Sequence, residues 1–581
     1  MASHSNHRFA VVPSGSRRAI TRTSGIVAVV MLVAAAEIAA VAHPPIDLGA
    51  NNASTPGAPN YANAAVTLPD GTLESYYRRG VAGSIPIFRM RSADNGRAWT
   101  APEPLVKLSI EPWGGPMPLL DREGELHFVI PKVRGEGRKP NVDRFIDLYH
   151  LRSTGGRTKW TEPARIYEGY CGALQGVFQL KSGRIIAPFA DWLPGVPTTP
   201  PTGPSVTTAV YSDDGGRTWQ RSPARLTAPC HEGANMSNYG ACEPTLIELK
   251  DGRVWMLIRT QDGYLYESFS NDGVNWSVAK RSRFHSSNSP AFPIRLPDGR
   301  LVVFWNNAEH SQRVGKDGVY SGRDALHAAI SSDEGKTWRG FREVYRDATR
   351  NGSPPKDGDR GTAYPHATVT KSGEILLVSG QGTDRRRRFL IDPDWLLEKS
   401  QEENFTNLDT WHLFKGFGKP ARFWRDRVQG PQLIAHPGKP GVKALHLRRP
   451  DERDADGAVW NFPAGRSGKL TLRLRVEKDF GGAQISLTDR MFEPCDDTGE
   501  KLAQFALELG RDGAVKPGSW HEIQLAWQVG RCRVSLDGKP LTTLDARSAA
   551  PDGLSYLRLR STAAAVDPVG FLVESVQVEV E

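Results

Sequence analysis

Short apolar segments, each followed by a polar turn and a second apolar segment, recur six times in the first two thirds of the chain. Each turn ends in a glycine, which reaches positive φ without steric cost, and residues that favour β-strands flank it on both sides. This pattern is typical of a β-hairpin. The six predicted hairpin turns are Pro69–Gly71, Arg122–Gly124, Lys181–Gly183, Lys250–Gly252, Pro297–Gly299 and Lys371–Gly373.

A second motif, Ser-x-Asp-x-Gly-x-x-Trp, occurs between these hairpins. Full copies are Ser92–Trp99, Ser212–Trp219 and Ser331–Trp338, and decayed copies end at Trp160 and Trp276. The five tryptophans recur about every sixty residues, which indicates repeated structural units. Four short strands fit into one such repeat, so residues 45–398 are predicted to form an all-β, six-bladed β-propeller.

The remainder of the chain, residues 404–581, has no further copy of the motif. Trp520–Trp527 alternates strictly, Cys532–Lys539 reads as a strand and a turn, and Leu470–Leu474 and Phe571–Val573 add further strands. These segments predict an antiparallel β-sandwich, or jelly roll. The domain resembles laminin-G and concanavalin-like modules. Such modules bind glycans or serve as structural appendages, and the absence of an identifiable aromatic platform favours the structural role.

The first 42 residues are expected to be a signal peptide. Arginines, including Arg17 and Arg18, precede an apolar stretch over Gly25–Ala36, and the small residues Ala40–Ala42 suit signal-peptidase cleavage. The pair Arg17-Arg18 loosely resembles a twin-arginine signal. A secreted or periplasmic protein is therefore expected. An uncleaved single-span anchor is the alternative, because Glu37 interrupts the stretch.

Composition narrows the range of partners. The net charge of +9 makes the surface mildly basic, which favours acidic ligands only weakly over this length. No nucleic-acid motif is present, and the longest basic run, Arg385–Arg388, is expected to be a solvated strand end. The five cysteines show no zinc spacing. No cofactor and no metal are expected.

The repeated motif also has a physical meaning of its own. Its Asp and Ser side chains can bind the amides of a tight hairpin, and its Trp can cover the turn, so these residues are structural. The motif resembles the Asp-box of sialidases (neuraminidases), which are BNR-repeat, six-bladed propeller glycoside hydrolases. The resemblance covers approximately residues 45–398.

Ligands of a propeller usually bind on its axis, near the innermost strands. Glu243 and Tyr364 lie nine residues before Gly252 and Gly373, so they occupy equivalent inner positions in two blades. In sialidases a Tyr attacks the anomeric carbon, a Glu polarises it, an arginine triad binds the substrate carboxylate and an Asp is the acid/base. The resemblance implies that Tyr364 is the nucleophile and Glu243 the polarising residue. It also implies that Arg259 and Arg323 are the second and third arginines of the triad.

Two elements of the sialidase pattern are absent. The opening strand, residues 60–66, lacks the first arginine, and the loop 80–86 lacks the Asp. Asp191 is a candidate for a displaced acid. His366 is expected to share a strand face with Tyr364 and to be its hydrogen-bond partner or a base. Candidates for a displaced positive charge are Arg78, Arg79 and Arg89.

Three functions remain open. The first is an exported, exo-sialidase-like glycosidase that acts on terminal anionic sugars of a carbohydrate partner. The second is cleavage of a uronic-acid glycan with His366 as base, and the third is a non-catalytic glycan-binding propeller. The retained Tyr364–Glu243 pair favours an enzyme, whereas the missing Arg and Asp count against strict sialic-acid specificity. If one site exists, Glu243, Arg259, Arg323 and Tyr364 should converge; otherwise each is a polar core residue.

Overall fold

In the computed structural model, the unit Ala42–Glu581 is built almost entirely of antiparallel β-strands. The predicted leader lies outside the described residues, as do several loops. No helix within the described residues has the length and apolar character needed to cross a membrane. The described residues are 42–50, 65–78, 85–137, 141–193, 204–230, 240–309, 322–352, 361–381, 386–415, 428–453, 455–492, 498–510 and 513–581.

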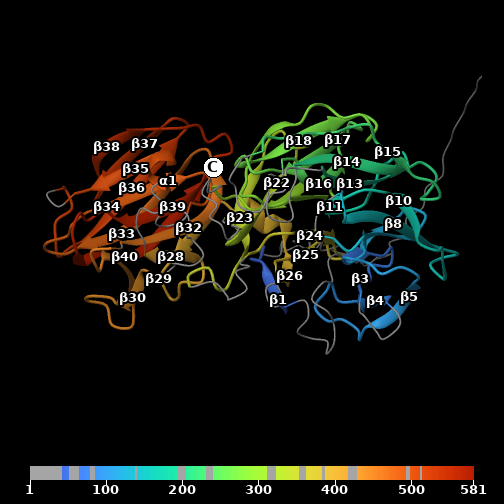
Figure 1. Cartoon of the computed structure of the whole chain (residues 1–581). Coiled ribbons are helices and arrows are strands. Elements are labelled where there is room, and N and C mark those ends of the chain that lie inside the picture. Colours follow the sequence, from blue (N-terminus) through green and yellow to red (C-terminus); the bar gives the residue numbers. More distant parts are fainter. Residues whose placement is uncertain are drawn as a thin grey trace, which may run out of the picture. The chain divides into compact units, whose positions relative to one another are not determined.

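Six antiparallel sheets follow one another along the chain and form the blades of a propeller (Figure 1). Blade 1 contains β2 (Ala65–Thr67), β3 (Leu73–Arg78), β4 (Ile85–Ser92) and β5 (Glu103–Leu108). Blade 2 contains β6 (Met117–Leu120), β7 (Leu126–Arg134), β8 (Phe145–Thr154) and β10 (Ala164–Tyr167), with β9 (Lys159–Trp160) beside β8. Blade 3 contains β11 (Cys171–Leu174), β12 (Phe178–Gln179), β13 (Ile185–Trp192), β14 (Ser205–Ser212) and β15 (Gln220–Arg221).

The remaining blades repeat this order. Blade 4 contains β16 (Cys242–Glu248), β17 (Val254–Arg259), β18 (Tyr264–Ser270) and β19 (Lys280–His285). Blade 5 contains β20 (Phe292–Arg295), β21 (Leu301–Trp305), β22 (Ala325–Ser331) and β23 (Arg339–Arg346). Blade 6 contains β24 (His366–Val369), β25 (Ile375–Ser379), β26 (Arg387–Ile391) and the N-terminal strand β1 (Ile46–Ala50). Because β1 completes the last blade, the two ends of the propeller are joined by a strand ladder.

The six predicted glycine turns are all present between the first two strands of a blade. Their glycines have φ between 82° and 94°. In each turn the glycine N–H donates to the carbonyl three residues earlier, at 2.9–3.1 Å. The Asp-box motif is structural, as expected. In the first copy Ser92 Oγ accepts from the Gly96 N–H, Asp94 accepts from the Ala98 N–H, and Trp99 Nε1 donates to the Gly96 carbonyl.

The C-terminal strands form two further sheets around a core that includes Trp411, Trp460 and Trp527. The strand β27 begins at Ser400, slightly before the expected start of the sandwich. The larger sheet contains β27 (Ser400–Glu403), β30 (Gln432–Ala435), β31 (Lys443–Arg449), β33 (Gly468–Val476), β36 (Trp520–Gln528), β37 (Arg531–Leu536), β38 (Lys539–Asp545) and β40 (Asp567–Val580). The smaller contains β28 (Trp411–Lys415), β29 (Val428–Gln429), β32 (Asp456–Gly465), β34 (Ala483–Thr488), β35 (Phe505–Leu509) and β39 (Leu554–Ser561). Two short helices are η1 (Pro393–Leu397) and α1 (Thr498–Leu502).

A buried polar network links the outer strand of blade 5 to the sandwich. Glu343 of β23 accepts hydrogen bonds from Tyr556 of β39 at 2.6 Å and from His412 of β28 at 2.9 Å. Its other carboxylate oxygen accepts from Arg346. Because the Glu343, His412 and Tyr556 side chains are fully buried, the network ties the two parts of the unit together.

Candidate active site

The antiparallel order of each blade gives the propeller two edges. The first (inner) strand of each blade runs toward its glycine turn, and the second strand runs back from it. The start of the first strand and the end of the second strand therefore lie together, at the edge away from the glycine turns. Glu243 lies at the start of β16 and Arg259 at the end of β17. Arg323 precedes β22, and Tyr364 precedes β24. Four residues from blades 4, 5 and 6 therefore share one edge of the propeller.

The structure brings the four predicted side chains into contact. Arg259 Nη1 donates to Glu243 Oε2 at 2.5 Å and to the Tyr364 hydroxyl at 3.2 Å. The Tyr364 hydroxyl in turn donates to Glu243 Oε1 at 3.3 Å. The Arg323 guanidinium lies 5.4 Å from the centre of the Tyr364 ring, within the range of a cation–π contact. The side chains are thus close enough to act on one ligand.

The cluster is deeply placed and rich in positive charge. The exposed fractions of Arg259 and Arg323 are 2% and 1%, Glu243 is 6% exposed, and Tyr364 is half-buried. Two guanidiniums face one carboxylate within these four residues. Buried charges of this kind interact strongly with a charged ligand, because little water screens them. The arrangement suits a ligand with an anionic group close to Tyr364.

Glu243 and Tyr364 share an uncommon backbone conformation. Their φ angles are 44° and 65°, a left-handed region that non-glycine residues rarely adopt. In blade 4 the strand register shifts between Cys242 and Thr245, as at a β-bulge. Each of the two residues is followed by a proline, Pro244 or Pro365. Strained backbone at about 1–3 kcal/mol per residue tends to occur at functional sites, and here it falls on the two predicted catalytic positions.

Two residues of the cluster were not anticipated. Asn288 joins the arginines, since its Oδ1 accepts from Arg259 Nε at 2.7 Å and its carbonyl accepts from Arg323 Nη2. Gln381, just after β25, accepts from Arg323 Nη1 at 2.8 Å. Neither carries a charge or belongs to a motif in the sequence. What the sequence shows of them is their position. Asn288 precedes the inner strand β20 and Gln381 follows the second strand β25, so both lie at the same edge of the propeller as the predicted residues.

Asp191, the candidate acid, is separate from this cluster. It lies near the end of β13 in blade 3, where it accepts from the Tyr167 hydroxyl at 2.7 Å. Its other oxygen accepts from Arg221 at 2.7 Å and Arg225 at 3.2 Å. Among the described residues it contacts none of the four clustered side chains. The structure therefore pairs Asp191 with its own arginines in blade 3.

The candidate displaced arginines are also placed elsewhere or not described. Arg78 donates to the carbonyls of Pro112 and Trp113 between blades 1 and 2. Arg89 pairs with Glu103 and Glu74 on blade 1. Arg79 lies outside the described residues.

His366 is not a partner of Tyr364. Its ring centre lies 5.2 Å from that of Phe292, with the two rings tilted by 52°, and it lines a cavity on the propeller axis. Burial, followed by the nearby Arg386 charge, lowers the pKa of His366 to about 3. His366 was expected to share a strand face with Tyr364, but β24 begins only at His366 and Tyr364, before it, has positive φ. The alternation of side chains along a strand therefore does not relate the two residues.

Comparison with known proteins identifies the propeller. A family described as BNR repeat-like domain matches residues 78–377, just over half of the chain. A sialidase from Micromonospora viridifaciens is 26% identical over 324 residues, which cover 48% of this chain and 46% of that protein. The chain thus spans about half the length of this curated relative.

Solved structures that are similar to this chain have low sequence identity to it. A protein of unknown function from Dyadobacter fermentans is 16% identical, with a TM-score of 0.42, over 60% of this chain and 98% of that one. A Trypanosoma rangeli sialidase in complex with sialic acid is 12% identical, with a TM-score of 0.38, over 90% of this chain and 91% of that one. The family match over residues 78–377 places this chain among the proteins with a BNR repeat-like domain, in the sialidase superfamily.

Proposed function

We propose that this protein is a glycoside hydrolase of the sialidase type that removes a terminal anionic sugar from a glycan with retention of configuration. The observation that carries the proposal is the position of the Tyr364 hydroxyl. It lies 3.3 Å from Glu243 Oε1 and 3.2 Å from Arg259 Nη1, beside the Arg323 guanidinium.

Tyr364 is the nucleophile in this proposal. Its oxygen forms a bond to the anomeric carbon while the bond to the leaving oxygen breaks. The Tyr364 proton passes to Glu243, and solvent water protonates the leaving oxygen. A neutral phenol approaches an anionic sugar without charge repulsion, and an adjacent carboxylate raises its nucleophilicity. The hydroxyl of a water molecule then bonds to the anomeric carbon while the glycosyl–tyrosine bond breaks. The other proton of that water passes to solvent, and Glu243 returns its proton to the Tyr364 oxygen. Two displacements at the same carbon retain its configuration.

Arg259 and Arg323 bind the carboxylate of the sugar. A guanidinium presents a planar fork of donors that matches a carboxylate, and such pairs are strong where water is excluded. Asn288 holds both guanidiniums at fixed orientations. The substrate class that suits these residues is a sialoside or a uronide.

A non-catalytic, glycan-binding propeller is the second candidate. It is favoured by the position of Asp191, whose carboxylate is engaged by Tyr167, Arg221 and Arg225 rather than by the cluster. Cleavage with His366 as base has no comparable support, because burial lowers the pKa of that ring to about 3.

The test is a panel of 4-methylumbelliferyl glycosides that includes sialosides and uronides. The aryl leaving group departs with little help from an acid, so the panel examines Tyr364 without requiring a proton donor. Tyr364→Phe should abolish turnover and leave binding of the sugar largely intact. A matched control is Tyr211→Phe, because the Tyr211 hydroxyl donates to Gln220 in blade 3 and, among the described residues, has no hydrogen bond to the four clustered side chains.

The outcome separates the two candidates. Turnover by the native protein that is lost in Tyr364→Phe and kept in Tyr211→Phe supports the hydrolase. Saturable binding of a sugar acid without turnover of any glycoside supports the binding propeller instead. Undiminished turnover in Tyr364→Phe contradicts the assignment of the nucleophile.

Export is part of the same proposal. The arginines and apolar stretch before Ala42 support removal of a leader and a secreted or periplasmic mature protein that begins near His43. N-terminal sequencing of exported material tests this, and recovery of Arg17 and Arg18 in that material contradicts cleavage.

A further inference from the structure

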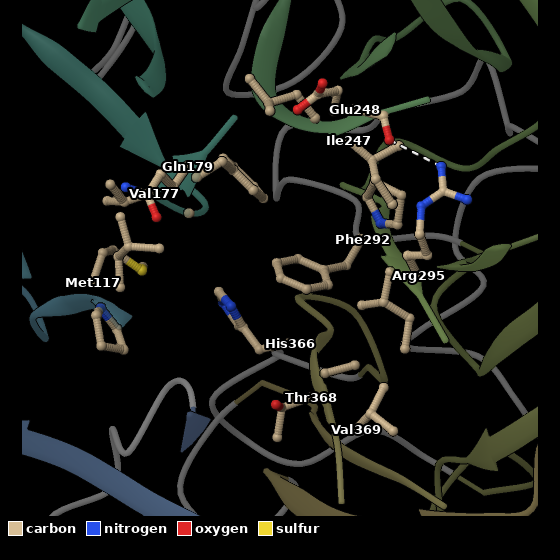
Figure 2. A pocket seen from close by; sticks show the side chains of 18 of the residues that line it. Met117, Val177, Gln179, Ile247, Glu248, Phe292, Arg295, His366, Thr368 and Val369 are labelled. Atoms are coloured by element: carbon tan, nitrogen blue, oxygen red, sulfur yellow. Dashed lines mark hydrogen bonds between the residues drawn. The ribbon is translucent and has the colours of Figure 1, made fainter. Parts of the chain in front are cut away.

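A cavity of about 490 Å³ lies on the axis of the propeller, between the inner strands of all six blades. Its walls are mostly apolar, with side chains that include Met117, Val177, Phe178, Phe292 and Val369. Figure 2 shows several of these side chains around the open centre. The volume falls within the range of small-molecule sites, which is about 300–1,000 Å³.

Most polar side chains of the wall are engaged by the protein itself. Thr368 Oγ1 lies 2.9 Å from Thr67 Oγ1. Gln179 Oε1 accepts from the Arg122 N–H at 2.9 Å. The two charged residues of the wall are Glu248 and Arg295. Glu248 accepts from the Lys181 N–H of blade 3, and Arg295 pairs with Glu334 of its own blade. These groups leave little free charge for a ligand.

His366 is the exception among the described residues of the wall. Its side chain is 4% exposed, and neither ring nitrogen has a hydrogen-bond partner in the described part of the chain. Figure 2 shows the ring directed into the cavity beside Phe292. Polar groups that face a cavity are normally hydrogen-bonded, either by water or by a ligand. A ligand with one hydrogen-bonding group would satisfy His366.

We infer that this axial cavity, defined by Met117, Val177, Phe178, Phe292, His366 and Val369, binds a neutral aromatic alcohol such as a phenol. Phe178 and Phe292, whose ring centres are 6.4 Å apart, provide aromatic contacts on the wall. The Met117 thioether adds a polarizable contact to an aromatic ring. A hydroxyl can both donate to and accept from the neutral His366 imidazole. Charged ligands are disfavoured because Glu248 and Arg295, the charged residues among the described lining, are already paired within the protein.

The site is independent of the proposed hydrolysis, because none of the four clustered residues lines the cavity. It can therefore be tested by binding alone. The probe is 2-naphthol, and its matched control is 2-methylnaphthalene, which has nearly the same shape without the hydroxyl. Equilibrium dialysis with the purified protein at neutral pH measures the affinity of each probe.

We expect saturable binding of one 2-naphthol per chain. In His366→Phe the affinity for 2-naphthol should fall about fivefold, as for the loss of one net hydrogen bond, and that for 2-methylnaphthalene should not. Filling the cavity with Val177→Trp, or with Ala65→Phe if the first variant fails to fold, should abolish binding of both probes. Thermal unfolding identifies any variant that does not fold.

Three results would overturn the inference. Neither probe binds saturably to the native protein; a filled variant that folds binds 2-naphthol as well as the native protein; or His366→Phe weakens both probes equally. The first would mean that the cavity holds only water, the second that the probe binds elsewhere, and the third that His366 makes no hydrogen bond to the ligand.

Discussion

Replacement of Tyr556 by Phe should destabilise the junction between the propeller and the sandwich. The Tyr556 hydroxyl donates to Glu343 Oε1 at 2.6 Å. The side chains of Glu343, Tyr556 and His327, which are hydrogen-bonded in series, are all fully buried. His327 Nδ1 accepts from the Asn307 N–H, so its Nε2 carries the proton that is donated to the Tyr556 oxygen. The hydroxyl is therefore both acceptor and donor.

The magnitude follows from the two bonds lost. A hydrogen bond to a charged carboxylate contributes about 1.5–3 kcal/mol, and a buried donor left without a partner costs about 1–3 kcal/mol. Phe keeps the ring in place against Ala308, Val459 and Met491, so no cavity term is added. We expect Tyr556→Phe to lower the free energy of unfolding by about 2.5–6 kcal/mol.

Urea unfolding of the native protein and the variant measures this difference. Tyr211→Phe is the control, because its hydroxyl contacts Gln220 at the surface and its loss should change the free energy of unfolding by less than about 0.5 kcal/mol. The reasoning is refuted if Tyr556→Phe is no more destabilising than this control.

Three further predictions address the site, pH and the turns. Arg323→Ala should weaken binding of the sugar acid by about 2–5 kcal/mol; unchanged affinity in a calorimetric titration would remove Arg323 from the site. Burial raises the pKa of Asp456 to about 6, so the folded protein binds this proton more tightly than the unfolded chain, and stability should fall as pH rises from about 4 to 6. Asp456→Asn should remove this part of the pH dependence of the free energy of unfolding in denaturant titrations. The same pH profile in the variant and the native protein would contradict the role of Asp456. Gly252→Ala should lower the free energy of unfolding by about 1–2 kcal/mol, because alanine is strained at the φ of 87° that Gly252 adopts. A steric clash does not contribute, because no atom lies within 4 Å of the added Cβ. Gly510→Ala, also in open space but without positive φ, should be close to neutral, and equal thermal stability of both variants would refute the strain argument.

The turns and blades could be predicted because their chemistry is local. A glycine such as Gly252 satisfies its turn within four residues, and the Asp-box binds its own amides, so each repeat shows in the sequence. The closure of blade 6 by β1 is different. There Asp47 of β1 pairs with Phe389 of β26, and these residues lie at opposite ends of the propeller sequence. A local sequence pattern does not predict a strand partner so far away along the chain.

The candidate site was predictable in part for the same reason. The glycine turns set the register of the inner strands, which is why Glu243 and Tyr364 could be placed at equivalent positions. Arg259 and Arg323 were added by the resemblance to sialidases. The interpretation of His366 was wrong because it assumed regular alternation across Tyr364, where φ is 65°. Asn288 acts through a side-chain oxygen and a carbonyl, and neither is visible in a residue pattern.

The interpretation of the basic run Arg385–Arg388 as a solvated strand end was wrong for its described residues, which begin at Arg386. Arg386 and Arg388 are buried, and Arg388 lies 4.6 Å from the centre of the Trp99 ring. Arg387 alternates with them and pairs with Asp47 on β1. Their burial depends on the neighbouring blade, which the run of charges does not reveal.

The central claim is that Glu243, Arg259, Arg323 and Tyr364 form one site in which Tyr364 attacks the sugar. The most direct test is to trap the glycosyl–enzyme with a fluorinated analogue of the sugar that the glycoside panel identifies, carrying fluoride as the leaving group at the anomeric carbon. Peptide mapping by mass spectrometry then locates the adduct. The account predicts one sugar per chain on the peptide that contains Tyr364, and none in Tyr364→Phe. An adduct on another residue, or one that forms equally in Tyr364→Phe, would contradict it.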